Sequence, residues 1–63
     1  MPAHEILLEA KKLHKVSDSL ELLAMQHAPL AEDLSILSGS VRNSATLLEV
    51  LVAVKMGPAL GLD

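Results

Sequence analysis

The chain has 63 residues and a formal net charge of −3, and it contains no cysteine and no aromatic residue although 51% of it is hydrophobic. These counts exclude a disulfide framework, a cysteine-based zinc site, a thiol nucleophile and an aromatic platform for stacking bases. A monomer of this size buries only about 60% of the surface of its unfolded chain and is marginally stable. Since small proteins usually add disulfides, a metal or association, we expect this chain to oligomerise or to bind a partner.

Prolines divide the sequence into two predicted helices of similar length. Pro2 suits the first turn of a helix over residues 3–27. Pro29 disfavours helical backbone at the residue before it, which predicts a turn at 28–29. A second helix is predicted over 30–56, because Gly57 and Pro58 then form a strong stop signal. The tail over 57–63 is predicted to be irregular and to dock on a neighbour through its two leucines.

Apolar residues recur at intervals of three and four in both segments, which predicts one apolar stripe along each helix. Two such helices joined by a tight turn form an antiparallel helical hairpin, so the predicted fold class is all-α. Glu9 falls within the angular range of the first stripe and is the most anomalous charged position of the chain. The predicted stripes are Ile6, Ala10, Leu13, Val16, Leu20, Leu23 and Ala24, and then Leu30, Leu34, Leu37, Val41, Ala45, Leu48, Val52 and Met56.

Further apolar residues lie outside these stripes and are exposed in a single hairpin. Burying one leucine side chain stabilises a protein by about 1.5–3 kcal/mol, so leaving several in water is costly for a chain with little core. A second copy of the hairpin covers them in a homodimeric four-helix bundle, and a higher oligomer or a different protein also satisfies the pattern. The predicted oligomer interface consists of Leu8, Leu22, Ile36, Leu47, Val50, Leu51 and Val54.

Two local signals favour an alternative fold with shorter helices. The segment from Asp18 to Glu21 matches a capping box, which can start a new helix near residue 17. Ser38, Gly39 and Ser40 have poor helix propensity and can interrupt the second helix. The alternative is a compact monomer of three or four short helices.

No residue pattern in the chain is typical of catalysis or of metal binding. His4, His14 and His27 are separated by ten and thirteen residues, so no two of them share a helix face at the spacing of three or four that ligand pairs need. The carboxylates have no partner set that indicates general acid–base work. We therefore expect no catalytic residue, no metal site and no cofactor, and we expect that the protein is not an enzyme.

One basic cluster, Lys11, Lys12, His14 and Lys15, stands near the middle of the first helix. Lysines flanked by acids, with the chain acidic overall, more often form a solvated face than a phosphate site. Nucleic acid is therefore not the expected ligand. A hairpin that binds RNA or DNA through these lysines and Arg42 is kept as a less favoured alternative.

A polar strip is predicted on the second helix between its two apolar faces. Glycine in the middle of a helix costs about 1 kcal/mol relative to alanine and usually has a reason. The strip is either a recognition surface, with Arg42 and Asn43 as specific contacts, or a place where Gly39 and the serines let another helix approach closely. Its residues are Ser35, Gly39, Arg42, Asn43 and Thr46, with Glu49 at the end.

The sequence predicts a function based on protein–protein contact. No secretory signal is visible and no clean apolar run reaches the ~20 residues of a membrane span, so we expect a cytoplasmic location and no membrane partner. The expected function is that of a small non-enzymatic interaction or regulatory protein that acts through self-association. The main alternative is a small chaperone, an antitoxin-like protein or an accessory subunit that binds a different protein.

Overall fold

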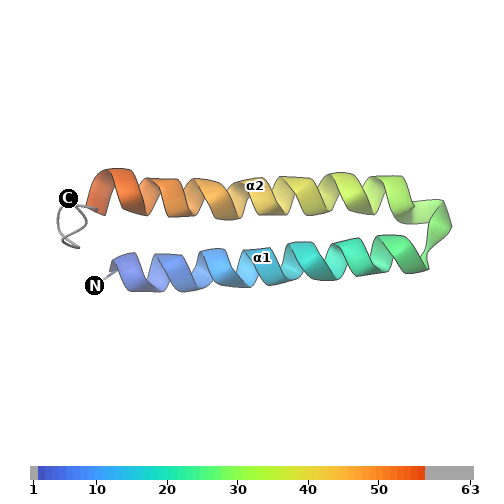
Figure 1. The fold of residues 1–63 in the computed structure, drawn as a ribbon, viewed down its shortest axis with the longest axis horizontal. Coiled ribbons are helices and arrows are strands. Elements are labelled where there is room, and N and C mark those ends of the chain that lie inside the picture. Colours follow the sequence, from blue (N-terminus) through green and yellow to red (C-terminus); the bar gives the residue numbers. More distant parts are fainter. Residues whose placement is uncertain (1, 57–63) are drawn as a thin grey trace.

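The computed structural model describes residues 2–56, which form two long helices joined by one short turn (Figure 1). Helix α1 spans Pro2–Gln26, the 3₁₀ turn η1 spans Ala28–Leu30 and helix α2 spans Ala31–Met56. The two helices run antiparallel, so the start of α1 lies beside the end of α2. The predicted all-α helical hairpin is therefore confirmed, whereas the predicted irregular tail 57–63 lies outside the described residues.

The turn follows from the local chemistry of its proline. The His27 N–H donates to the Leu23 carbonyl at 3.0 Å, which completes the last helical turn, and the His27 backbone then leaves the helical region at φ −130° and ψ 78°. The Leu30 N–H donates to the His27 carbonyl at 2.9 Å and closes η1. Pro29 fits this turn because its ring fixes φ and it has no N–H to satisfy. The prediction ended the first helix at residue 27, and the structure ends it at Gln26.

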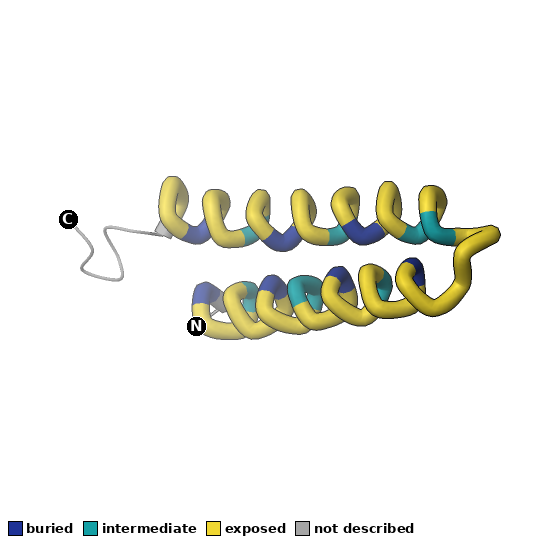
Figure 2. Tube along the Cα trace, turned by 45° about the vertical axis from the view of Figure 1, so that its right-hand side comes forward, coloured by how far each residue is buried: buried dark blue, intermediate teal, exposed yellow. Residues whose placement is uncertain are grey.

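The helices meet along small side chains that recur at every seventh position. Figure 2 shows that the buried positions of α1 and α2 lie on the sides that face each other. A seven-residue repeat of this kind, alternating with a second position three residues on, is a coiled-coil seam. We call it the inner seam. Its small positions are Ala3, Ala10, Ser17 and Ala24 in α1 and Ala31, Ser38, Ala45 and Val52 in α2, and its half-buried larger positions are Ile6, Leu13, Leu20, Leu34, Val41 and Leu48.

A buried serine pair stands at the centre of the inner seam. The Ser17 hydroxyl donates to the Ser38 backbone carbonyl at 2.9 Å, and the Ser38 hydroxyl donates to the Ser17 backbone carbonyl at 2.8 Å. The two hydroxyl oxygens are themselves 2.9 Å apart. Because a serine oxygen extends only one bond beyond Cβ, these contacts require the two backbones to lie very close together. The pair therefore marks a close approach of α1 and α2 and satisfies the polar side-chain atoms buried there.

The serine pair also sets the register of the hairpin. In an antiparallel pair, one heptad toward the start of α1 corresponds to one heptad toward the end of α2. Small residues therefore oppose small residues along most of the contact, which keeps the helices close from one end to the other. The opposed positions are Ser17 with Ser38, Ala10 with Ala45, Ala24 with Ala31, and Ala3 with Val52.

The predicted core stripes were partly wrong in their phase. Four of their residues, Val16, Leu23, Leu30 and Leu37, are 41–53% exposed. The contact positions beside them lie one residue further along the chain: Ser17, Ala24 and Ser38 are buried and Ala31 is half-buried. The largest apolar side chains therefore do not define the centre of this contact, because only small ones fit between backbones at this separation. The predicted Met56 side chain lies outside the described part of the chain.

Two other expectations are corrected by the helices themselves. Glu9 does not lie in the contact between the helices, because its side chain is exposed and pairs with Lys12 Nζ at 3.1 Å. The possible helix breaks near Ser17 and at 38–40 do not occur, and α1 and α2 run through both segments without interruption. The alternative of three or four short helices is therefore not found over residues 2–56.

Candidate interaction surface

One flank of the hairpin is closed by ion pairs between α1 and α2. Arg42 Nη2 lies 2.7 Å from Glu21 Oε1 and 3.4 Å from Asp18 Oδ1, and the same Glu21 oxygen is 3.3 Å from the Ser38 hydroxyl. The capping-box carboxylates of the sequence therefore bind an arginine of the opposite helix. We call this side, formed by His14, Glu21, Arg42 and Glu49, the polar flank.

A second cross-helix pair lies one heptad away on the polar flank. His14 Nε2 is 3.3 Å from Glu49 Oε2, an ion pair when the imidazole is protonated. His14 precedes Glu21 by seven residues and Glu49 follows Arg42 by seven, so both pairs obey the register of the serine contact. Exposed pairs of this kind each contribute about 0–1 kcal/mol. They orient the two helices more than they stabilise them.

Only part of the predicted polar strip is engaged within the hairpin. Arg42 binds α1 as described, and the Thr46 hydroxyl donates to the Arg42 carbonyl of its own helix at 3.1 Å. Gly39 is exposed, and a Cβ placed there meets no atom within 4 Å. The glycine is therefore not what allows α1 and α2 to pack closely. Ser38, one of the serines that the alternative expectation placed at a close helix approach, makes the close contact with α1. Ser35 and Asn43 are exposed on α2.

The seven residues predicted to form an oligomer interface are all accessible in the hairpin. Their exposed fractions lie between 44% and 68%. In contrast, the largest apolar side chain buried between the helices is that of Val52, and the other buried apolar residues are alanines. The accessible residues are Leu8 and Leu22 on α1 and Ile36, Leu47, Val50, Leu51 and Val54 on α2.

A second heptad repeat runs along α2 and is entirely exposed. Each of its positions except Val54 directly precedes a position of the inner seam, so the repeat is rotated by about 100° around the helix axis. It contains three of the predicted interface residues, and Ile36 and Val50 lie beside it. We call it the outer seam, and it consists of Leu30 at the end of η1 and Asp33, Leu37, Ser40, Ser44, Leu47, Leu51 and Val54 on α2.

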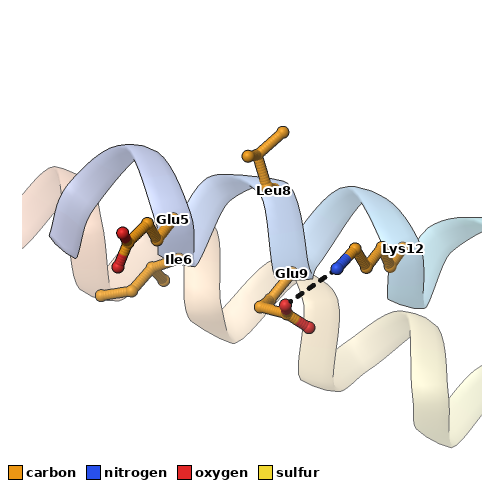
Figure 3. A pocket seen from close by; sticks show the side chains of 5 residues that line it. All are labelled: Glu5, Ile6, Leu8, Glu9 and Lys12. Carbon is orange, nitrogen blue, oxygen red and sulfur yellow. Dashed lines mark hydrogen bonds and ion pairs between the residues drawn. The ribbon is translucent and has the colours of Figure 1, made fainter.

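A hollow of about 400 Å³ near the start of α1 is lined by Glu5, Ile6, Leu8, Glu9 and Lys12 (Figure 3). Leu8 points away from Ile6 and Glu9, and Glu9 and Lys12 pair with each other. The lining groups therefore do not converge on a common point where a reacting atom could be held. A second hollow of about 430 Å³ lies near the turn, beside Met25 and Ser35.

The basic cluster is partly neutralised by neighbouring acids. Lys12 pairs with Glu9 and His14 pairs with Glu49, while Lys11 and Lys15 are exposed. Arg42, which an RNA- or DNA-binding surface was expected to use, binds Asp18 and Glu21. Within the described residues, no three histidine or acidic side chains gather closely enough to hold a metal ion.

Comparisons of the chain with protein-family models, with curated proteins and with solved structures each find no match. Neither helix of the described region combines the length and the apolar content that crossing a bilayer requires. Over residues 2–56 the molecule is a closely packed helical hairpin with a polar flank and an exposed outer seam.

Proposed function

We propose that this chain is a small, non-enzymatic interaction protein that acts through self-association. The observation that carries the proposal is the contrast between what the hairpin buries and what it leaves exposed. The contact between α1 and α2 buries alanines, two serines and Val52 and half-buries the larger inner-seam residues, whereas the larger apolar side chains of the outer seam stay exposed. Since burial of a leucine is worth about 1.5–3 kcal/mol and burial of an alanine far less, the isolated hairpin has little stabilisation of its own.

The polar flank supports the choice of the apolar surface for association. Arg42 and His14 already have carboxylate partners within the hairpin. A charged partner that binds there breaks these pairs, and their loss offsets part of the free energy that the new contact contributes. The outer seam has no such competing contact to lose, so burying it is the more favourable route to an assembly.

Sedimentation at micromolar concentration tests the proposal directly. We expect the chain to sediment as a dimer or a higher oligomer, with a melting temperature that rises with protein concentration. A cooperatively folded monomer of ordinary stability contradicts the proposal. A chain that is monomeric and only loosely folded also contradicts it, and favours the accessory-subunit function, in which a different protein covers the seam.

Lysine substitutions separate the assembly from the hairpin. Leu51→Lys or Ile36→Lys is expected to weaken the assembly at least tenfold, because each loses apolar burial of at least about 1.4 kcal/mol and adds a charge. Leu34→Lys is expected to unfold the hairpin itself, since Leu34 lies on the inner seam. Thr46→Lys is the matched control, since it adds the same charge to an exposed position of α2 outside both seams.

A further inference from the structure

We infer that α2 packs antiparallel against α2 of a second copy along the outer seam, with the twofold axis beside Ser40 and Ser44. The inference rests on the proposed self-association and specifies its partner, its face and its register. Three observations carry it: the angle between the two seams of α2, the order of residues along the outer seam, and the charges at the two ends of the helix.

The angle between the seams fits a four-helix bundle. Outer-seam positions precede inner-seam positions by one residue, which is a rotation of about 100°. In a square bundle each helix has two neighbours at roughly a right angle. α2 therefore has one face for α1 and a second face at the angle where another helix belongs. Val16 and Leu23 of α1 precede inner-seam residues in the same way, so they extend this exposed side onto the first helix.

With the exception of Asp33, the residue order of the outer seam is self-complementary when it is reversed. Two serines stand at its centre, a leucine stands on each side of them, and apolar residues stand at both ends. Antiparallel pairing about this centre places serine opposite serine and apolar residues opposite apolar ones, and it sets Asp33 opposite Leu51, one turn from Lys55 of the second copy. A shift by half a heptad in either direction leaves residues at the ends unpaired and sets leucines against serines. The pairs are Ser40 with Ser44, Leu37 with Leu47, Asp33 with Leu51, and Leu30 with Val54 of the second copy.

The centre of the seam is suited to burial despite its two serines. The Ser44 hydroxyl donates to the Ser40 carbonyl of its own helix at 3.2 Å, so its hydrogen is already satisfied. Ser40 and Ser44 are small, as are the residues at the close contact inside the hairpin. A second α2 can therefore approach this point without leaving the Ser44 donor unpaired.

The charges at the ends of α2 favour the antiparallel direction. Glu32 and Asp33 lie in its first turn and Lys55 lies in its last turn. Antiparallel packing places the Asp33 carboxylate within about one turn of Lys55 of the second copy and aligns the helix dipoles favourably. Parallel packing instead brings like charges together at both ends, which is destabilising.

Disulfide trapping tests the register, and the chain suits it because it contains no native cysteine. Leu37→Cys and Leu47→Cys are made as separate single variants, mixed in equal amounts and oxidised mildly. We expect cross-linked mixed dimers to include about half of the chains or more, since random pairing makes half of the dimers mixed. Either variant alone is expected to cross-link little, because its two thiols are ten residues apart along the seam, roughly 15 Å, beyond the ~7 Å Cα separation that a disulfide spans.

The outcomes separate this inference from the proposed function. Cross-linking of each variant with itself indicates parallel packing and overturns the inference. Little cross-linking in any mixture, while the unmodified chain sediments as an oligomer, shows that another face is used, and overturns the inference but not the self-association. A monomeric unmodified chain overturns both.

Two further variants keep the test interpretable. Thr46→Cys mixed with Leu37→Cys measures random collision and is expected to cross-link little, because Thr46 lies outside the outer seam. Leu30→Cys mixed with Val54→Cys repeats the test at the ends of the seam, where the loss of a leucine disturbs the centre less. Sedimentation under reducing conditions verifies that each cysteine variant still associates before it is oxidised.

Discussion

The inner and outer seams of α2 are two heptad repeats on one helix, displaced by a single residue, and they differ in size. The inner seam places Ala31 and Ser38 at its contact with α1, whereas the outer seam carries Leu30 and Leu37 at the corresponding places. Small residues bring two backbones close and make the contact specific, but they bury little apolar area. Large residues bury more area once a partner covers them. The inner seam therefore aligns α2 with α1, and the outer seam adds stability when a partner buries it.

The largest expected effect comes from enlarging an inner-seam residue. Ala45→Leu inserts a branched side chain where Ala10 opposes it, so the helices must separate and the Ser17–Ser38 hydrogen bonds are lost. We expect a loss of about 3 kcal/mol in the free energy of unfolding, measured by urea denaturation at fixed protein concentration. Ala53→Leu, at an exposed alanine of the same helix, is the control, and we expect it to change stability by less than about 0.5 kcal/mol. Equal effects of the two variants contradict the close contact.

A smaller effect distinguishes the serines of the two seams. Ser38→Ala removes the hydroxyl that bonds the Ser17 carbonyl and is expected to cost about 1 kcal/mol. Ser40→Ala, on the outer seam, is expected to be neutral or to stabilise by a few tenths of a kcal/mol, because alanine is the better helix former. The Ser17→Ala, Ser38→Ala double variant is expected to cost less than twice the single change, since either single change already removes the contact between the two hydroxyls. A stabilising Ser38→Ala shows instead that the hydroxyl pair contributes no net stability.

An effect of about the same size as that of Ser38→Ala, but of opposite sign, is expected at a position on neither seam. Gly39→Ala adds a Cβ that meets no atom within 4 Å and removes the conformational freedom of glycine in the unfolded chain. We expect the hairpin to gain about 1 kcal/mol in thermal or urea unfolding, with no change in sedimentation. Weaker association of this variant indicates that the Gly39 face also takes part in the assembly.

The sequence was sufficient to predict the two helices and their antiparallel packing. Pro29 ends the first helix for a reason that depends only on neighbouring residues, and the three-and-four spacing of apolar residues extends over each helix. Signals that are local or periodic in this way do not depend on the partner of a residue. The capping-box pattern from Asp18 to Glu21 was misleading for the opposite reason, because its carboxylates bind Arg42, which is distant in sequence.

The apolar pattern of the sequence predicts a core that is one residue out of phase over part of each helix. Weighting by hydrophobicity favours Leu23 over Ala24 and Leu37 over Ser38, whereas the distance between the backbones favours the smaller residue of each pair. A usable signal was present, since alanine or serine recurs at every seventh position from Ala3 to Ala45. Arg42 was placed in a recognition strip because only the register of the folded hairpin brings it beside Glu21.

The seven-residue spacing passes through the turn without interruption, because Ala24 and Ala31 are themselves seven residues apart. The heptad repeat therefore continues from α1 through the turn into α2, and the length of each helix is set in steps of seven residues. Removing a whole heptad from each helix gives a shorter hairpin in which small residues still oppose small ones. Removing any other number rotates one helix relative to the other and places a leucine or a charged side chain where the backbones are closest. Natural or designed chains built on this plan should therefore differ in length by multiples of seven residues per helix.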